Sequence, residues 1–131
     1  GLLLANAFIK DEFFNDKKIL IIERESKTLN DKTFSFWDNQ SNVLDRIVFK
    51  SWEKAEFKDS EFTSSFNLSP YKYKMVRSDR FYSYMRKKID RASNFNYLNA
   101  NVIDIEKDLN RNNVKTDQGD FLCTIVFSEY I

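Results

Sequence analysis

The sequence is poor in residue types that many functional sites require. It has no histidine and a single cysteine, Cys123, among 131 residues. Without histidine, the chain cannot form a Ser-His or Cys-His catalytic pair, and one cysteine excludes both an intramolecular disulfide framework and a cysteine-rich zinc site. We therefore expect no metal site, and we interpret Cys123 as a small buried hydrophobic residue.

Glycine and proline are also scarce, with two residues and one residue. This scarcity excludes collagen-like, low-complexity and linker-rich chains. The 21 basic and 20 acidic residues give a net charge of +1, which provides no bulk attraction to nucleic acid or to an anionic membrane. No apolar run approaches the ~18 residues of a membrane-spanning helix. The length suits one domain or a piece of a larger one.

Both ends of the sequence pass through apolar segments. The chain starts with Gly1 and not with Met, directly before residues 2–9 (LLLANAFI), and it stops soon after residues 121–127 (FLCTIVF). The basic leader and the small-residue cleavage site of a signal peptide are missing from this start. We interpret both ends as cuts in a longer protein.

The first 25 residues predict a helix, a short turn and a buried strand. Residues 2–9 are apolar nearly all round, which is typical of a helix buried on more than one side. Asn15 and Asp16 indicate a turn. Residues 19–22 (ILII) predict a strand buried on both faces, and it ends at Glu23. Together these elements form the second half of a βαβ unit.

The rest of the chain predicts short strands and one amphipathic helix. Residues 43–57 and 95–105 suggest short strands, and residues 71–76 alternate in polarity after Pro70. Ser78 is a suitable N-cap for a helix over residues 79–90. Turn signals at 112–113 and 118–120 predict flanking strands over 114–116 and 121–127.

The spacing of Gly1 and Glu23 is the first chemical signal. They are 23 − 1 = 22 residues apart, with the helix and the strand between them. The dinucleotide-binding fingerprint places its last glycine at the start of a helix and an acidic residue about twenty residues later. That glycine allows close helix–strand packing, the helix N-terminus favours pyrophosphate, and the carboxylate accepts hydrogen bonds from ribose. By itself, this half-fingerprint leaves a merely solvated Glu23 equally open.

Several motifs together resemble the lycopene cyclase family. They are the segments Gly1-Leu2-x-Leu4-Ala5, LIIER (20–24), KTFSFWD (32–38), Ser51-Trp52 and YKYKMVRSDRFY (71–82). The KTFSFWD run is similar to an Arg-Thr-Trp-Cys-Phe-Trp run of the family and departs from it at Lys32, Phe34 and Ser35. The tyrosine-rich segment that ends in Met-Val-Arg before a helix is the more specific match.

The resemblance implies an α/β fold, covering essentially the whole chain as the N-terminal part of such an enzyme. This is a glutathione-reductase-like, FAD/NAD(P)-binding Rossmann domain that lacks its first strand here and carries an inserted antiparallel β-sheet. Residues 1–131 would form a partial FAD-binding domain, and roughly residues 40–76 would belong to the substrate-domain insertion, which walls an apolar groove.

The resemblance also implies roles for individual residues. The FAD-binding positions would be Gly1 at the pyrophosphate, Glu23 at the adenosine ribose, Arg24 beside adenine, Lys32 in a loop, Arg77 at a helix start, and the backbone around Val102. Phe36 and Trp37 would lie toward the flavin or the substrate. No residue here matches the family's acidic catalytic motif, and Asp38, the only acid inside the aromatic run, is a poor candidate.

The implied reaction is a non-redox isomerisation in carotenoid biosynthesis. Proton addition to a terminal double bond of lycopene gives a carbocation, which closes a β-ionone ring and then loses a proton. Reduced FAD would stabilise the cation or donate the proton, and NAD(P)H would only keep the flavin reduced. Lycopene and carotenoid intermediates are the expected partners, without nucleic acid, and we expect a cytoplasmic protein in peripheral contact with a membrane.

Structural interpretations of the same residues remain open. Tyr71, Tyr73 and Met75 form a packed sheet face or line a carotenoid groove. Phe34, Phe36 and Trp37 serve core packing or touch substrate, and Arg77 binds the cofactor or pairs with Asp79 on the surface. Lys72 and Lys74 are interpreted as a solvated face.

Other functions are also open at this point. A related FAD-dependent hydroxylase or prenyl reductase would share the FAD half, and a non-catalytic or decayed nucleotide-binding fragment would share the fold. We expect the 131-residue chain alone to be inactive and to bind FAD weakly.

Overall fold

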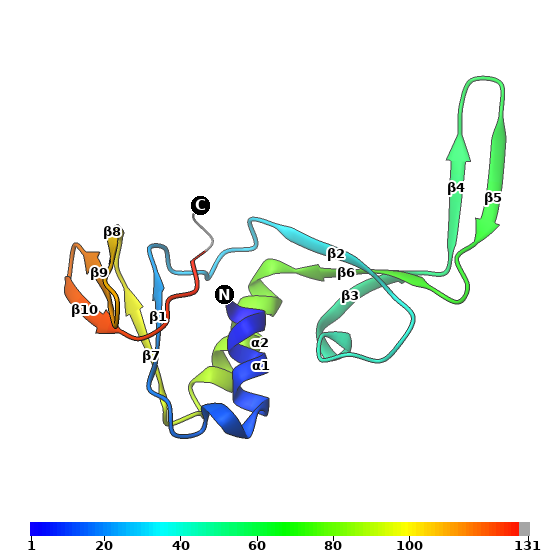
Figure 1. Ribbon diagram of the computed structural model, residues 1–131. Coiled ribbons are helices and arrows are strands. Elements are labelled where there is room, and N and C mark those ends of the chain that lie inside the picture. Colours follow the sequence, from blue (N-terminus) through cyan, green and yellow to red (C-terminus); the bar gives the residue numbers. More distant parts are fainter. Residues whose placement is uncertain (129–131) are drawn as a thin grey trace. The chain divides into compact units, whose positions relative to one another are not determined.

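The computed structural model of the chain describes residues 1–128, which form a mixed α/β protein with two α-helices and ten short strands (Figure 1). The chain divides into two units. Unit 1 contains Gly1–Lys27 and Met85–Ile131, and unit 2 contains Thr28–Tyr84. Unit 2 is therefore inserted into the sequence of unit 1, and the two are described separately.

Unit 1 starts with the predicted helix, turn and strand. Helix α1 (Leu2–Lys10) is followed by the 3-10 helix η1 (Glu12–Phe14) and strand β1 (Ile19–Glu23). Asp11 ends α1 with an extended backbone, and its carboxylate accepts a hydrogen bond from the Phe13 N–H at 3.0 Å. The same residue thus terminates one helix and caps the next.

Strand β1 pairs in parallel with β7 (Phe95–Asn99), and the register runs from Ile19 opposite Phe95 to Glu23 opposite Asn99. Helix α2 (Ser78–Ile89) leads back to β7, and its last residues, from Met85, belong to unit 1. Figure 1 shows α1 beside this part of α2. Parallel neighbours need such a crossover, because a tight turn cannot join them.

The core of unit 1 lies between these helices and strands. It contains Ala5, Ile89 and Phe95, against which seven partly buried residues pack: Leu2, Phe8, Ile9, Ile19, Ile21, Ala92 and Tyr97. Leu3 of α1 and Leu20 of β1 do not belong to this core and are exposed.

The predicted burial of α1 on more than one side is therefore wrong, since Leu3 is 51% exposed. The predicted burial of β1 on both faces is also wrong, since Leu20 is 38% exposed. Apolar composition indicated that these segments could be buried, whereas burial also needs neighbours on each side.

A three-stranded antiparallel sheet completes unit 1. Its order is β10 (Gly119–Cys123), β9 (Asn112–Thr116) and β8 (Val102–Lys107). The strands predicted over residues 95–105 are confirmed as β7 and β8. Asn112 and Asn113, predicted as a turn, instead start β9, because their backbones pair with both neighbouring strands. The last strand starts at Gly119 and ends at Cys123, well short of residue 127.

Unit 2 contains a second antiparallel sheet, with β6 (Lys72–Arg77) between β2 (Thr33–Asp38) and β3 (Val48–Trp52). The short 3-10 helix η2 (Asp45–Ile47) precedes β3. One face of the sheet packs on the first turns of α2, where the ring of Phe34 lies 5.0 Å from that of Phe81. Val76, on the same face, is completely buried.

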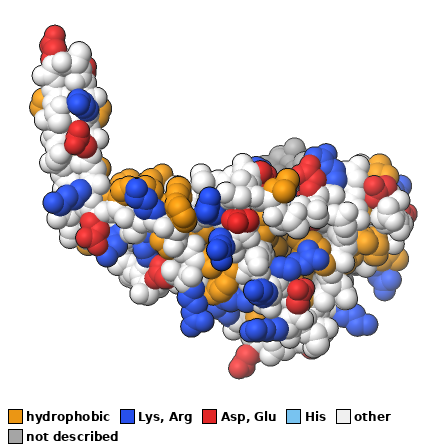
Figure 2. Space-filling view, turned by 180° about the vertical axis from the view of Figure 1, so that it is seen from behind, with side chains coloured by type: hydrophobic (Ala, Val, Ile, Leu, Met, Phe, Trp, Pro, Cys, Tyr) orange, Lys and Arg blue, Asp and Glu red, His pale blue; other side chains and the backbone are white. Residues whose placement is uncertain are grey.

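Strands β4 (Lys54–Lys58) and β5 (Thr63–Asn67) form a separate hairpin in unit 2. Their register places Phe57, Phe62 and Phe66 on one face, and each of these side chains is more than half exposed. Figure 2 shows hydrophobic atoms reaching the surface of this hairpin beside charged side chains. The other face of the hairpin is polar.

Ser78 connects the start of α2 to the loop before β2. Its side chain is fully buried, and its Oγ accepts a hydrogen bond from the Lys32 N–H at 3.1 Å. The Leu29 carbonyl and the Asp31 carboxylate, each at 3.1 Å, are acceptors for its hydroxyl proton. The residue predicted as an N-cap is thus the first residue of the helix, and it fixes residues 29–32 as well.

Replacing Ser78 with Ala is expected to destabilise the protein by about 1–3 kcal/mol, because the Lys32 N–H would lose a part-buried hydrogen bond to this fully buried side chain. Urea unfolding would measure the change. Ser83→Ala is the control, since Ser83 is an exposed serine in the same helix. Equal stability of the two variants would contradict the assigned role of Ser78.

Candidate functional site

Glu23 ends β1, at the carboxyl edge of the parallel strand pair. Its side chain is 33% exposed, and one carboxylate oxygen lies 3.5 Å from the Lys27 ammonium. Its backbone carbonyl accepts hydrogen bonds from the Ala100 N–H at 3.2 Å and from the Asn99 side chain at 3.1 Å. The backbone is thus fixed while the carboxylate remains accessible, as an acceptor for ribose hydroxyls requires.

Three of the other predicted FAD-binding residues also belong to unit 1. Arg24 follows Glu23, is 66% exposed, and donates a hydrogen bond to Glu25 at 3.0 Å. Val102 starts β8 two residues after Ala100, which contacts Glu23. Gly1 is the N-cap of α1. Figure 1 shows α1 running opposite to β1, so the N-terminus lies toward the end of the unit where β1 ends.

The close-packing argument for Gly1 is not supported by the described residues. A Cβ added to Gly1 would meet nothing within 4 Å. The helix N-terminus can still supply backbone N–H groups to an anion, since that property depends on the helix and not on the side chain.

Tyr97 lies next to this edge on β7. The Arg86 guanidinium lies 3.9 Å from the centre of its ring, in a cation–π contact. Burial raises the pKa of the Tyr97 phenol, Arg86 opposes that shift, and the Glu23 charge adds to it. Tyr97 therefore stays neutral at physiological pH and contributes an apolar wall with a hydrogen-bonding end.

Lys32 and Arg77 come together in unit 2. Arg77 lies opposite Thr33, the residue after Lys32, in the pairing of β6 with β2. The N–H of Ser78, the residue after Arg77, donates a hydrogen bond to the Lys32 carbonyl at 3.0 Å. The Arg77 guanidinium lies 4.7 Å from the centre of the Phe49 ring. This ring contact replaces the surface pair with Asp79 that the sequence left open.

Phe36 and Trp37 point to opposite faces of β2. Phe36 lies opposite Lys74 and Trp37 lies opposite Tyr73, and successive residues of a strand alternate between the two faces. The two residues predicted near the flavin or the substrate therefore cannot line the same surface of the sheet.

The face that carries Trp37 has a row of three aromatic side chains. Trp37, Tyr73 and Trp52 are direct neighbours across β2, β6 and β3. The ring of Tyr73 lies 4.9 Å from that of Trp37 and 5.8 Å from that of Trp52. Trp37 is 59% exposed. We call these three residues, one from each strand, the aromatic row. Their rings are tilted by 45° and 37° to one another, and the Lys50 ammonium lies 5.2 Å from the centre of the Trp52 ring.

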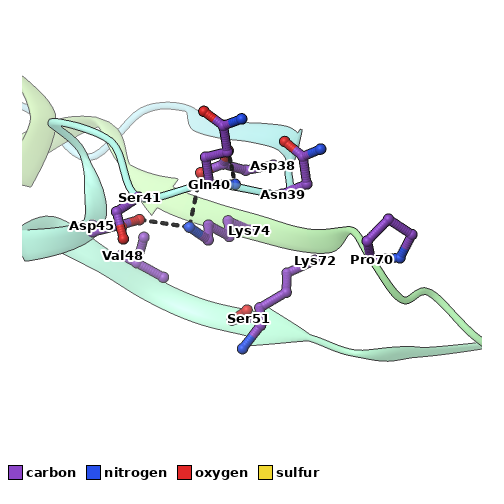
Figure 3. A pocket seen from close by; sticks show the side chains of 10 residues that line it. All are labelled: Asp38, Asn39, Gln40, Ser41, Asp45, Val48, Ser51, Pro70, Lys72 and Lys74. Carbon is purple, nitrogen blue, oxygen red and sulfur yellow. Dashed lines mark hydrogen bonds and ion pairs between the residues drawn. The ribbon is translucent and has the colours of Figure 1, made fainter.

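The opposite face carries an ion cluster around Lys74. Its ammonium lies 2.9 Å from the Asp38 carboxylate and 2.6 Å from the Asp45 carboxylate (Figure 3). The side chains of Lys74 and Asp38 are only 11% and 13% exposed. They line an open depression of about 410 Å³ with Gln40, Ser51 and other polar residues.

These contacts correct the interpretation of Lys74 as part of a solvated face, because the loop over residues 39–47 brings Asp45 over it. Hydrogen bonds from Lys74 hold the pKa of Asp38 and that of Asp45 below the ordinary value, and the two carboxylates raise the pKa of Lys74. Asp38 is therefore ionised at neutral pH, which argues against its use as an acid.

The sequence did not predict three of the residues that the structure places at these surfaces. Trp52 joins the aromatic row through the pairing of β3 with β6, and Lys27 reaches Glu23 across the turn after β1. The four-residue spacing of Glu23 and Lys27 was a usable signal for that pair. Asp45 reaches Lys74 only because of the path of the loop. Loop residues follow no periodic pattern, so the sequence could not predict this contact.

A family model described as "Lycopene cyclase protein" matches residues 1–128 of the chain. No curated protein and no solved structure matches the chain significantly.

The Lys74 cluster predicts how stability depends on pH. Because the pKa values of Asp38 and Asp45 are lower in the folded state, their contribution is present above about pH 4 and is lost as the pH falls through the folded values. We expect Lys74→Met to reduce this acid-dependent loss, as measured by urea midpoints between pH 6 and pH 2.5. Lys54→Met removes an exposed lysine of β4 in the same unit and is the control. An identical pH profile for Lys74→Met and the parent chain would contradict this account.

Proposed function

Because the chain belongs to the lycopene cyclase family, we propose that it is part of a flavin-dependent enzyme that closes the ends of lycopene into β-ionone rings. The observation that carries this proposal is the match over residues 1–128, together with Glu23 at the carboxyl end of a parallel strand. In parallel α/β sheets, ligands bind at this edge. The reaction would be an isomerisation in carotenoid biosynthesis.

The residues of unit 1 fit the adenosine half of FAD. An accessible carboxylate at Glu23, the start of α1 at Gly1, and the backbone at Val102 are the groups that a Rossmann-type site uses for ribose, pyrophosphate and adenine. Arg24 would lie on the adenine side. For Lys32 and Arg77, which belong to unit 2, the contact with the cofactor stays a prediction of the resemblance. This support favours a glutathione-reductase-like Rossmann fold for the complete domain, with roughly residues 40–76 in its substrate-side insertion.

When bound, reduced FAD would supply an electron-rich ring that stabilises positive charge or delivers a proton, and NAD(P)H would keep it reduced. The reaction itself needs no net electron transfer. A proton adds to a terminal double bond of lycopene, a neighbouring double bond attacks the resulting cation and closes the ring, and a proton then leaves. This chain holds no assigned acid for the first step, since Asp38 is ionised by its contact with Lys74.

The aromatic row is suited to the hydrocarbon part of this chemistry. Trp37 is exposed and offers apolar contact area to a hydrocarbon, and aromatic ring faces attract positive charge, as the contact of Lys50 with Trp52 illustrates. We assign substrate contact to Trp37, with Tyr73 and Trp52 beside it. Phe36 faces the other side of β2, so we assign it to packing on that side.

Lycopene and its cyclised intermediates would reach this surface from a membrane, since a polyene hydrocarbon is insoluble in water. Within residues 1–128, no helix is long and apolar enough to cross a bilayer. We propose a cytoplasmic enzyme with peripheral membrane contact.

Replacing Glu23 with Ala is expected to weaken FAD binding by about ten- to a hundredfold, the equivalent of hydrogen bonds to a charged acceptor. The measurement is a titration of the ¹⁵N-labelled chain with FAD, followed through amide shifts of residues 19–27. Such a titration also reports weak affinity. Stability should change little, because the Glu23 side chain is partly exposed.

Glu12→Ala is the control for Glu23, because it removes the same charge from η1, before β1 starts. Its FAD affinity should equal that of the parent chain. Unchanged affinity in the Glu23 variant would remove the ribose role from this residue.

Replacing Trp37 with Ala is expected to weaken binding of lycopene, supplied in detergent micelles, by roughly three- to tenfold, as loss of one aromatic contact predicts. The shift of the polyene absorption bands measures bound lycopene. Phe36→Ala is the matched control, as it removes an aromatic ring from the adjacent position on the opposite face. Equal loss of lycopene binding in both variants would contradict assignment to the exposed face.

A further inference from the structure

Two asparagine side chains hold the two ends of β1. The amide of Asn94, just before β7, donates hydrogen bonds to the carbonyls of Phe14 at 2.8 Å and Lys17 at 3.0 Å. The amide of Asn99, the last residue of β7, donates to the carbonyls of Glu23 and Arg24, both at 3.1 Å. Each asparagine thus uses both of its amide protons on two backbone carbonyls beside one end of β1.

A backbone hydrogen bond also extends the parallel ladder by one residue at each end of β1. The Ile19 N–H donates to the Asn94 carbonyl at 2.9 Å, and the Ala100 N–H donates to the Glu23 carbonyl at 3.2 Å. Beyond Glu23 the chain leaves the sheet, so the Arg24 carbonyl has no strand partner in the pairing of β1 with β7, whereas the Glu23 carbonyl already accepts from Ala100. The Asn99 amide binds both carbonyls and so restricts the turn that carries the Glu23 carboxylate.

We propose that Asn99 is a positioning residue for the ribose site, acting through the backbone of Glu23 and Arg24. This inference rests on the proposed function of Glu23 as the ribose acceptor. Asn99 does not touch the carboxylate itself. It restricts the backbone from which the carboxylate and the Arg24 side chain extend, and a group held in its bound direction loses less conformational entropy when the ligand binds. Asn94, with the same chemistry at the distant end of the strand, has no such effect on the site.

The test compares Asn99→Ala with Asn94→Ala in the ¹⁵N-labelled chain. Each variant loses one asparagine with two backbone acceptors, so both should lower stability to a similar extent. Without cofactor, Asn99→Ala should accelerate hydrogen exchange of the Ala100 amide relative to amides of α2, and Asn94→Ala should do so for the Ile19 amide. Asn99→Ser, whose side chain is too short to reach both carbonyls, is a second variant.

Titration with FAD then separates positioning from general stability. Asn99→Ala should raise the dissociation constant about three- to tenfold, as loss of one or two ordinary hydrogen bonds predicts, while Asn94→Ala leaves it unchanged. In a Glu23→Ala background, Asn99→Ala should have a smaller effect on the dissociation constant, since only its action through the Arg24 backbone would remain.

Three results would overturn the inference: an unchanged FAD affinity in Asn99→Ala, an equal loss in Asn94→Ala, or a full effect of Asn99→Ala without the Glu23 carboxylate. If the parent chain bound FAD with no dependence on Glu23, the proposed ribose role would fail, and the positioning role would fail with it. FAD binding that depends on Glu23 but not on Asn99 would overturn this inference alone.

Discussion

The parallel pairing of β1 with β7 determines how the rest of unit 1 is arranged. Parallel strands need a crossover, so the chain leaves the sheet at Glu23 and returns through α2. The crossover also includes the whole of Thr28–Tyr84. The entropic cost of closing a loop grows only slowly with the length of the loop. Once the strand ends are fixed, a long insertion between them therefore costs little more free energy than a short connection. Fixed strand ends are therefore the condition under which unit 2 can be inserted at this point.

This condition gives the hydrogen bonds at the edge of the sheet a double role. Ala100 extends the ladder to the Glu23 carbonyl, and Asn99 binds the Arg24 carbonyl that the ladder leaves open, beside the carboxylate that we assign to ribose. An unsatisfied carbonyl near such a site would attract water or move toward another donor. The hydrogen bonds that terminate β1 thus also restrict the position of the Glu23 carboxylate.

Local signals in the sequence predicted single elements of both units. The aliphatic run before Glu23 predicted β1 to within one residue, and Ser78 marked the start of α2. The family resemblance is also confirmed over residues 1–128. Burial was less predictable, because Leu20 belongs to an apolar run and is nevertheless 38% exposed.

The contacts that sequence periodicity could not predict are those between distant segments. Alternation placed Lys74 on the face opposite Tyr73, and nothing in the alternation showed that a loop would bring Asp45 to it. Asn99 gave no signal either, because its partners lie 75 and 76 residues away. In both cases the contact depends on the path of the backbone between distant segments. Composition and residue spacing predict contacts only within a single helix or strand.

The aromatic row depends on the opposite face of its sheet. A slip of one residue in the pairing of β2 with β6 would turn Trp37 inward and Phe36 outward. On the inner face, Val76 is fully buried, Phe34 packs on Phe81, and Asp38 reaches the Lys74 ammonium. A slipped register would break the contact of Phe34 with Phe81 and the ion pair of Asp38 with Lys74, and it would remove one of the two carboxylates that balance the buried Lys74 charge, which is costly. The apolar surface assigned to lycopene is therefore held in place by an ion pair and a packed ring that never touch it.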